Sequence, residues 1–324
     1  MKQWIAIDNV CAWPNLQVLN DGVVAAIIYN QPNHGLSEGS LECWTSKDSG
    51  ASWSLSGIPA PAPKGQNRMH ISAGVDEKGD LLVISSGFET TPDEKTYGAM
   101  QRMWFSRSSD NGKTWTIDRD IEIIDNPKFT PNYCIPHGRI LTLSDGSLGA
   151  TFYQGSTVWL SNSSDGGHTW TRKSTLDTED GTEAVIYKKE EGGLYAVVRT
   201  FDDHHVDLYE SSNDYKTWTR LKSLTGPMQH PADLTLLKNG NLLLTYGIRH
   251  KGSMGVGARR SEDGGKTWKS PWVLTNLGKA RDCGYPSTVQ LKTGEIVTAY
   301  YTDHVPNHHR YHMGVLQWEL EDFI

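Results

Sequence analysis

Six side chains that could bind or transform a ligand recur at one place in a repeated sequence pattern. Each stands nine or ten residues before a glycine in a turn, at the start of an apolar-rich segment. The six are Trp13, His70, His137, Glu183, His230 and Tyr285. Packing alone would favour valine, isoleucine or leucine at such positions. Because convergent polar and aromatic groups are typical of a ligand pocket, we predict that these residues line one.

Tyr285 and Glu183 offer the chemistry of covalent catalysis. A phenol becomes a nucleophile when a neighbouring carboxylate takes its proton, and Glu183 could do this for Tyr285. The reaction then needs an acid, which we expect from the loop of the first repeat. The candidates there are, in order, Glu38, Glu42 and His34, and each could equally be a hydrogen-bonding residue of the pocket rim.

A set of arginines indicates that the ligand is anionic and polyhydroxylated. Arg199 and Arg249 stand at or just after the end of the second strand in two repeats, and Arg68 precedes one of the six pocket positions. A guanidinium group binds a carboxylate through two parallel N–H bonds, so these three arginines are the predicted clamp. The other predicted substrate-binding residues are His70, His137, His230 and Trp13.

Neither a metal nor another cofactor is expected. His308, His309 and His312 lie close together, but on a predicted loop their spacing does not place them on one face, as it would on a helix. Asp282 and Asp303 either orient neighbouring bases or cap turns. Both interpretations stay open at this level.

Six predicted β-hairpins must position these residues. Each consists of an apolar-rich strand, a turn centred on glycine and a second apolar strand. The turn glycines are Gly22, Gly79, Gly146, Gly193, Gly240 and Gly294, spaced by 47 to 67 residues. This period fits one β-propeller blade, and no segment shows a sustained helical period. We therefore predict an all-β chain, a six-bladed β-propeller of four-stranded antiparallel blades that forms a single domain over residues 1–324.

An octapeptide follows the third predicted strand in four of the repeats. Its copies are SKDSGASW (46–53), SSDNGKTW (108–115), SSDGGHTW (163–170) and SEDGGKTW (261–268), and SNDYKTW (212–218) is a shortened fifth copy. The Ser, Asp and Gly are expected to close a turn by side-chain-to-backbone hydrogen bonds. Because strand direction alternates, these turns and the glycine turns lie at one end of each blade. The six pocket positions lie at the other end, so the octapeptide is predicted to be structural.

The last repeat lacks the octapeptide and needs a strand from elsewhere. Residues 310–320 are its predicted third strand, and QWIAI (3–7) could supply the outer strand that closes the ring. Such closure would remove an exposed sheet edge.

Composition excludes several classes of partner. The net charge is −7 and no basic run occurs, so nucleic acid is not expected. No apolar stretch reaches the roughly 18–20 residues that span a bilayer, so no membrane is expected. The N-terminus lacks the pattern of a secretory signal, which predicts a cytoplasmic protein, or a secreted or periplasmic one if a signal has been removed. The four cysteines, which have no CxxC pair, are expected to be buried thiols: Cys11, Cys43, Cys134 and Cys283.

The octapeptides and hairpins together resemble the sialidase (neuraminidase) superfamily, whose repeat is called the Asp-box or BNR repeat. The resemblance covers essentially the whole chain. It implies three arginines on a substrate carboxylate, a Tyr–Glu nucleophile pair and an aspartic acid as general acid. On this basis Glu183 and Arg199 look like the family's Glu and second Arg, Tyr285 like its Tyr, and Arg249 like its third Arg.

The first blade departs from that family pattern. Where the family has Arg-Ile-Pro, this sequence has Ala12, Trp13 and Pro14. The loop that would hold the acidic Asp contains His34, Glu38 and Glu42 instead. Arg68 from the next blade could replace the missing arginine.

Three functions are consistent with these residues. The first is a sialidase-like glycoside hydrolase, exo-acting on the non-reducing end of an acidic glycan that contains sialic or uronic acid. The second is a polysaccharide lyase or rhamnosidase-type propeller acting on uronic-acid glycans, in which a lyase base would be His70, His137, His230 or Tyr285. The third is a non-catalytic glycan-binding propeller. Release of a reducing sugar would indicate the hydrolase, an unsaturated product would indicate the lyase, and binding without turnover would indicate the glycan-binding propeller.

Overall fold

The computed structural model describes residues 1–124, 133–189, 192–212 and 214–323, and strands make up its regular structure. Within these ranges the only helix is the short 3-10 helix η1 (Leu320–Phe323). This confirms the prediction of an all-β chain with few helices. None of the described helices is long and apolar enough to cross a membrane.

Four of the sheets contain four strands each. The first is β2 (Cys11–Val18), β3 (Val24–Tyr29), β4 (Leu41–Ser46) and β5 (Ser54–Ala60). The second is β15 (Gly181–Lys188), β16 (Leu194–Thr200), β17 (Val206–Ser211) and β18 (Trp218–Ser223). The third is β19 (Gln229–Leu236), β20 (Leu242–Ile248), β21 (Met254–Ser261) and β22 (Trp272–Gly278). The fourth is β23 (Cys283–Gln290), β24 (Ile296–Thr302), β25 (His312–Trp318) and β1 (Lys2–Asp8).

The other nine strands form one sheet, which departs from the predicted six separate sheets. One half is β6 (His70–Val75), β7 (Leu81–Thr90), β8 (Tyr97–Ser108) and β9 (Thr116–Asp118). The other is β11 (Ile135–Thr142), β12 (Leu148–Gln154), β13 (Thr157–Ser163) and β14 (Thr169–Leu176), with β10 (Glu122–Ile124) parallel to β14. A short parallel pairing of β6 with β11 joins the halves. Gly74 permits this approach, because a Cβ there would lie 2.0 Å from the Ile140 carbonyl oxygen.

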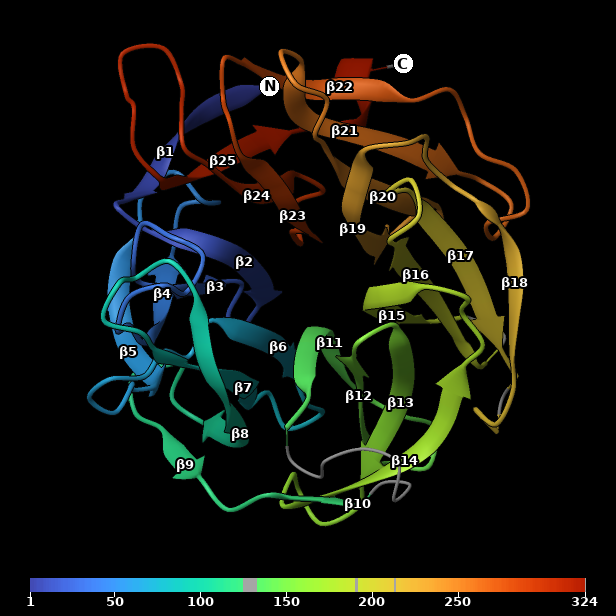
Figure 1. The fold of residues 1–324 in the computed structure, drawn as a ribbon. Helices are drawn as coiled ribbons and strands as arrows, with labels where there is room; N and C mark the ends of the chain where they lie inside the picture. The colour runs from blue at the N-terminus through green and yellow to red at the C-terminus, as the bar shows by residue number, and fades with distance from the viewer. Residues whose placement is uncertain (125–132, 190–191, 213, 324) are drawn as a thin grey trace.

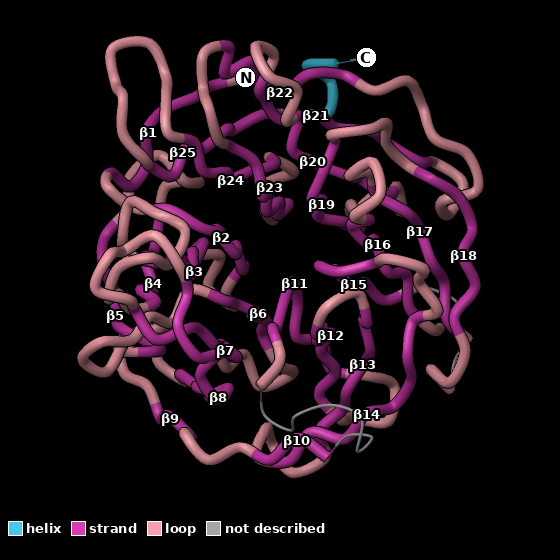
Figure 2. Tube along the Cα trace, in the orientation of Figure 1, coloured by secondary structure: helices cyan, strands magenta, loops and turns pink. Residues whose placement is uncertain are grey.

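The sheets are arranged as a ring, with their first strands facing the middle (Figure 1). These inner strands are β2, β6, β11, β15, β19 and β23, and each contacts the next around the ring. Many of the connections between strands lie at the outside of the ring (Figure 2). The core is distributed between neighbouring sheets as clusters of buried aliphatic and aromatic side chains.

The ring is closed by strands from both ends of the chain, as predicted. β1 pairs antiparallel with β25, from Lys2 opposite Gln317 to Asp8 opposite His312. Side chains of β1 and β25 then pack into a cluster that also holds residues of β2 and β3, including Ile7, Val315 and Ile28. The outer edge of this sheet is therefore formed by the N-terminal strand.

The octapeptide copies form turns of the expected kind. In the third copy, the Ser163 hydroxyl donates to Asp165 at 2.8 Å and accepts from the Gly167 N–H at 2.9 Å. Asp165 also accepts from the N–H of Thr169 at 2.9 Å, and the Trp170 indole donates to the Gly167 carbonyl at 2.8 Å. Copies at 46–53, 108–115 and 261–268 share this network. Position 213 of the shortened copy lies outside the described residues.

Strand pairing also places these turns at the end opposite the candidate pocket. Val18 pairs with Val24, which pairs with Ser46, so the glycine turn and the octapeptide turn of the first sheet lie together. At the other end of the same strands, Cys11 pairs with Tyr29, next to Trp13. The octapeptide therefore lies away from the candidate pocket, which fits a structural role.

Candidate active site

Irregular strand pairing presents most of the predicted pocket residues. The register of an inner strand against its neighbour breaks between Cys11 and Asn15, His137 and Ile140, Gly181 and Ala184, Gln229 and Ala232, and Gly284 and Ser287. Trp13, Glu183, His230 and Tyr285 fall inside these breaks, and His137 borders one. Bulges redirect side chains and are frequent beside active sites. On β6, by contrast, His70 pairs regularly with Ser86.

Tyr285, Glu183 and Arg199 form one hydrogen-bonded group. The Tyr285 hydroxyl donates to Glu183 Oε1 at 2.5 Å. Arg199 Nη1 donates both to Glu183 Oε2 at 2.9 Å and to Tyr285 Oη at 3.2 Å. Tyr285 adopts a left-handed backbone (φ 49°), which is unusual for a bulky residue and consistent with a functional position.

The charges in this group favour an ionised carboxylate beside a protonated phenol. Burial raises the pKa of Glu183, but the Arg199 charge and the hydrogen bonds from Tyr285 and Arg199 bring it to about 2. Burial and the Glu183 charge raise the pKa of Tyr285 well above its usual value. At neutral pH the phenol is therefore the proton donor and Glu183 the acceptor, which is the state from which a tyrosine nucleophile is activated.

Asp282 forms the centre of a second group, which we call the Asp282 cluster: Asp282, Arg249, His34, Tyr301 and Tyr311. Its carboxylate contacts Arg249 Nη2 at 2.7 Å and His34 Nε2 at 2.5 Å. It also accepts from the hydroxyls of Tyr301 at 3.0 Å and Tyr311 at 2.9 Å. Burial raises the pKa of Asp282, but these donors, with His34 and Arg249 foremost, lower it to about 2.

Trp13 lies between the two groups. Its ring stacks on Tyr285, with centroids 4.2 Å apart and planes 15° apart, and the edge of His34 approaches it at 5.1 Å. Trp13 belongs to the Ala-Trp-Pro segment at which the sequence departs from the Arg-Ile-Pro pattern: Ala12 stands in place of the arginine, and Trp13, in place of the isoleucine, stacks on Tyr285.

The three predicted histidines are buried and uncharged at neutral pH. Burial lowers the pKa of His70 to about 3 and, together with the charges of Arg199 and Arg249, lowers the pKa of His230 to about 3. Burial also lowers the pKa of His137, whose ring lies 6.0 Å from that of Tyr285. Each offers one donor and one acceptor rather than a positive charge.

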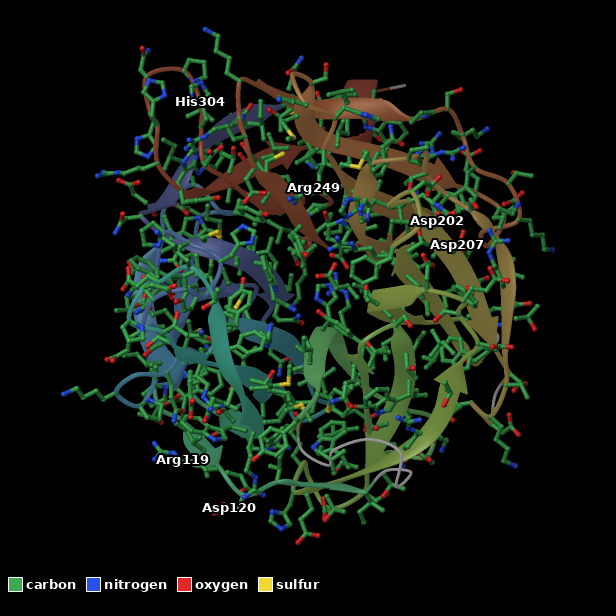
Figure 3. The ribbon with its side chains drawn as sticks, viewed as in Figure 1. Arg119, Asp120, Asp202, Asp207, Arg249 and His304 are labelled. Atoms are coloured by element: carbon green, nitrogen blue, oxygen red, sulfur yellow. The ribbon has the colours of Figure 1, made fainter. Side chains whose placement is uncertain are left out.

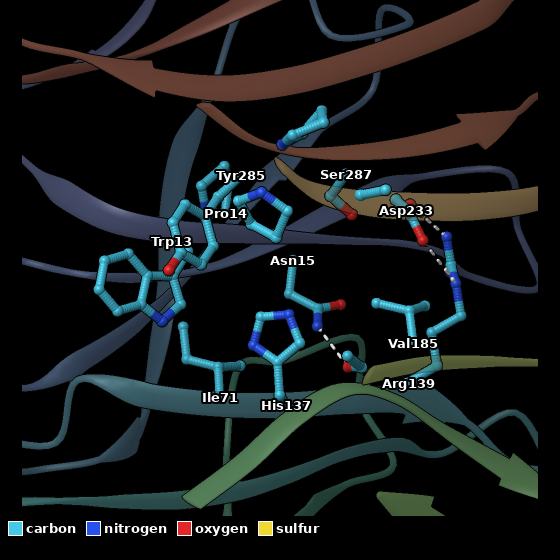
Figure 4. Close-up of a pocket in the computed structure, with 14 residues that line it drawn as sticks. Trp13, Pro14, Asn15, Ile71, His137, Arg139, Val185, Asp233, Tyr285 and Ser287 are labelled. Atoms are coloured by element: carbon cyan, nitrogen blue, oxygen red, sulfur yellow. Dashed lines mark hydrogen bonds and ion pairs between the residues drawn. The ribbon is translucent and has the colours of Figure 1, made fainter. Parts of the chain in front are cut away.

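A small cavity of about 30 Å³ lies on the axis beside Trp13 and Tyr285 (Figure 4). Its lining includes Asn15, His137 and Asp233. This volume is enough for roughly one water molecule, so the cavity itself does not accommodate a sugar. The solvent-facing edge of the site is formed instead by Arg199, Arg249 and His34, whose side chains are 17, 20 and 30% exposed.

Two of the three acid candidates lie apart from these groups. Glu38 is exposed and accepts from the Gly65 N–H, and Glu42 accepts from Asn30 and from the Trp44 indole. In the described ranges neither contacts Tyr285 or Glu183. Of the three acid candidates, only His34 has ring contacts with Trp13 and a bond to Asp282.

Arg68 does not supply the missing clamp arginine. Its guanidinium stacks over Trp104 with Cζ 3.4 Å from the ring centroid, and Nη1 donates to the Arg102 carbonyl at 2.6 Å. It lines a separate hollow of about 430 Å³ that also includes Arg119, which Figure 3 shows at the periphery while Arg249 lies near the middle. Arg68 precedes β6, the first strand of the next sheet, and its guanidinium stacks on Trp104. Among the described residues, no contact joins it to Arg199 or Arg249.

Asp282, Tyr301 and Tyr311 are the site residues that sequence reasoning did not assign. The sequence is consistent with Asp282 either as a turn cap or as an orienting group, and its contacts in the structure favour the second. The available signal was its place three residues before Tyr285, in the segment DCGY. Tyr311 follows a loop and carried no signal of its own.

Comparisons with known proteins give a family and a fold. Residues 73–298 match the model of the BNR repeat-like domain. No curated protein matched the chain.

Solved structures with the same fold cover nearly all of the chain. A crystal structure of a protein of unknown function from Dyadobacter fermentans has a TM-score of 0.82 and 21% identity, covering 98% of this chain and 97% of the other. A variant of the NanB sialidase from Streptococcus pneumoniae has a TM-score of 0.78 and 13% identity, covering 99% of this chain and 71% of the other. The intramolecular trans-sialidase from Ruminococcus gnavus has a TM-score of 0.70 and 14% identity, covering 97% of this chain and 96% of the other. At these identities the likeness concerns the fold alone.

Proposed function

The chain belongs to the BNR repeat-like domain family, and on that premise we propose that it is a sialidase-type glycoside hydrolase acting on the non-reducing end of a glycan. The contact of Tyr285 Oη with Glu183 Oε1 at 2.5 Å carries the proposal, because it pairs a nucleophile with its base. We count the nine-stranded sheet as two blades, so that six blades surround this pair. The structural neighbours that are sialidases and trans-sialidases support the class of reaction.

In the first step, the Tyr285 oxygen attacks the anomeric carbon of the sugar and forms a glycosyl–tyrosine bond. Its proton passes to Glu183 Oε1 along the existing hydrogen bond. Arg199 Nη1, already 3.2 Å from the phenol oxygen, stabilises the negative charge that develops there. The bond from the anomeric carbon to the leaving-group oxygen breaks in the same step.

The leaving-group oxygen needs a proton, and we assign this role to His34. Nε2 of His34 faces Asp282, which holds the imidazole in place and leaves Nδ1 for the leaving group. The hydrogen bond from Tyr97 Oη to the His34 carbonyl, 2.7 Å long, fixes the backbone of the same loop. In the second step water attacks the anomeric carbon, its proton returns to His34, and the Tyr285 oxygen regains its proton from Glu183.

A trapping experiment tests the covalent step. A 2-fluoro glycosyl fluoride slows hydrolysis of the intermediate, so that the glycosylated enzyme accumulates. Mass spectrometry of the digested protein should then locate the sugar on the peptide that contains Tyr285. Release of sugar from aryl glycosides with no adduct on Tyr285, or with an adduct elsewhere, would contradict the proposal.

A further inference from the structure

The charged residues of the site are neutralised within the chain. Arg199 pairs with Glu183 at 2.9 Å and Arg249 with Asp282 at 2.7 Å. The four side chains are only 6 to 20% exposed, so solvent screens these pairs weakly. Each arginine therefore has a counter-ion before a substrate arrives. A carboxylate on the substrate would have to compete with Glu183 or Asp282 for the guanidinium group that each of them binds.

Both terminal nitrogens of Arg249 are already used. Nη1 donates to the Cys283 carbonyl at 2.6 Å and to Tyr301 Oη at 3.2 Å, and Nη2 donates to Asp282. A substrate carboxylate would have to displace Asp282, which competes as an intramolecular group at high effective concentration. Once displaced, Asp282 would repel the substrate carboxylate as a like charge.

The imidazoles around the site do not supply the missing positive charge. His70 and His230 are neutral at physiological pH, because burial lowers the pKa of each to about 3. His34 points Nε2 at Asp282, the carboxylate that Arg249 also binds.

One corner of the site has polar atoms suited to hydroxyl groups. At this corner, three buried side-chain nitrogens have no hydrogen-bond partner among the described residues: Arg199 Nε, His204 Nδ1 and His230 Nδ1. The two imidazole rings lie 5.0 Å apart. Phe201, 49% exposed, lies 6.0 Å from His204 and 5.4 Å from the Arg199 guanidinium. Buried polar atoms normally find a partner, and an exposed aromatic ring can stack on the apolar face of a sugar.

We infer that the sugar bound beside Tyr285 is uncharged, with hydroxyl groups on the Arg199–His204–His230 corner, and that Asp282 excludes acidic sugars by occupying Arg249. This rests on the proposed function only in taking the ligand to be a glycan. It reverses the expectation from sequence that a clamp of arginines selects an acidic sugar.

Matched sugars that differ only in a carboxylate test this inference. Binding of methyl glucoside against methyl glucuronide, methyl galactoside against methyl galacturonide, and methyl sialoside against its carboxamide is measured by calorimetry. The Tyr285→Phe variant prevents turnover and retains every charge. We expect the neutral member of at least one pair to bind about tenfold or more tightly than its acid. Equal or tighter binding of the acid, or binding of no neutral sugar, would overturn the inference.

Removal of the internal counter-ion should reduce or abolish the preference for the neutral sugar. In Asp282→Asn, Arg249 is left without its carboxylate, and the affinity for the acidic sugars should rise about tenfold relative to the unaltered chain. Asp120→Asn is the matched control, because it removes the same charge from a side chain that is 86% exposed. An unchanged affinity in a folded Asp282→Asn variant would refute exclusion by Asp282. The comparison of matched sugars uses no Asp282 variant, so it tests the inference even if Asp282→Asn does not fold.

Turnover separates this inference from the proposed function. Hydrolysis of acidic aryl glycosides, with none of neutral ones, would overturn the inference and leave the hydrolase proposal standing. Selective binding of neutral sugars, with no aryl glycoside hydrolysed, would support the inference and overturn the hydrolase proposal.

Discussion

The hydroxyl of Tyr285 donates to Glu183 Oε1 at 2.5 Å, although 102 residues separate them along the chain. Tyr285 comes from a bulge at the start of β23, and Glu183 from a bulge at the start of β15. The two strands belong to different sheets, and the sheet that contains β19 lies between them in the ring. The pair therefore exists only where three sheets are correctly packed.

Loss of the Tyr285 hydroxyl should abolish turnover while leaving the fold intact. Tyr285→Phe keeps the ring that stacks on Trp13 but has no nucleophilic oxygen. We expect kcat to fall on the order of 10⁴-fold or more, as for other lost nucleophiles. Tyr300→Phe is the control, since that buried hydroxyl accepts from Gln3 outside the site and kcat should stay within a few fold. An active Tyr285→Phe enzyme would exclude the covalent mechanism.

If His34 is the acid, its loss should matter only for substrates whose leaving group needs a proton. His34→Asn should slow hydrolysis of methyl glycosides and of other glycosides with a poor leaving group by about 10²–10⁴-fold, because their leaving oxygen needs a proton. Dinitrophenyl glycosides leave without protonation, so their rate should change little. Comparison of kcat/KM for the two substrate types checks this.

Glu38 provides the comparison for that experiment. It is the first acid candidate by sequence, yet it is exposed and accepts from the Gly65 N–H. Glu38→Gln should therefore leave both substrate types within about threefold of the unaltered enzyme. A leaving-group dependence in Glu38→Gln, and none in His34→Asn, would transfer the role of acid to Glu38.

The octapeptide aspartates should contribute to stability in a pH-dependent way. Burial raises the pKa of Asp165, but hydrogen bonds from Thr169, Ser163 and His168 lower it to about 2, against about 3.9 in an unfolded chain. A lowered folded-state pKa gives stability that is full above about pH 4 and is lost as the pH falls toward 2. Asp165→Ala should therefore cost about 1 kcal/mol at pH 7, after allowance for solvent screening, and less near pH 2.

Urea unfolding at several pH values measures that dependence. Asp120→Ala, at an exposed position, is the control and should change the unfolding free energy little. KM should be unaffected in Asp165→Ala, because the turn lies at the opposite end of its sheet from the candidate site. A changed KM with unchanged stability would contradict the structural role.

Gly138 allows β11 and β15 to pack closely beside the site. Its φ is 79°, and a Cβ there would lie 2.9 Å from the Ala184 carbonyl oxygen and 3.0 Å from Val185 Cα. Gly146 has the same φ but open space around it. Both Ala variants carry backbone strain of about 1 kcal/mol, and only Gly138→Ala should also displace β15, with Glu183, and lower kcat. Equal losses of stability and activity in the two variants would show that this packing is unimportant.

Local patterns were sufficient to predict the hairpins and to place the candidate residues at the start of the inner strands. Glycine turns identify hairpins because few other residues adopt a positive φ, and Gly22, Gly79 and Gly146 all do so here. Counting back from such turns found Glu183 and Tyr285, because every inner strand has about the same length. The closure by β1 was predictable because one repeat was a strand short.

Relationships between separate loops were not predictable from sequence. Nothing in the pattern distinguishes a free Arg249 from one paired with Asp282, because the pairing depends on how two loops meet in space. The same applies to Arg68, whose stacking on Trp104 depends on rotamers rather than on strand order. The joining of β6 to β11 depends on a local approach that hairpin counting cannot detect.

The pairing of β1 with β25 has a consequence for biosynthesis. Lys2 pairs with Gln317, so β1 is made before the other strands of the ring but can pair only once β25, the last of these strands, has been made. Until then β24, once made, lacks its neighbour on one side and the nascent ring is open, with sheet edges available to other chains. Circular permutation that joins the two ends and opens the chain between sheets would make β1 and β25 neighbours in sequence, so that the last sheet could form without waiting for the rest of the chain.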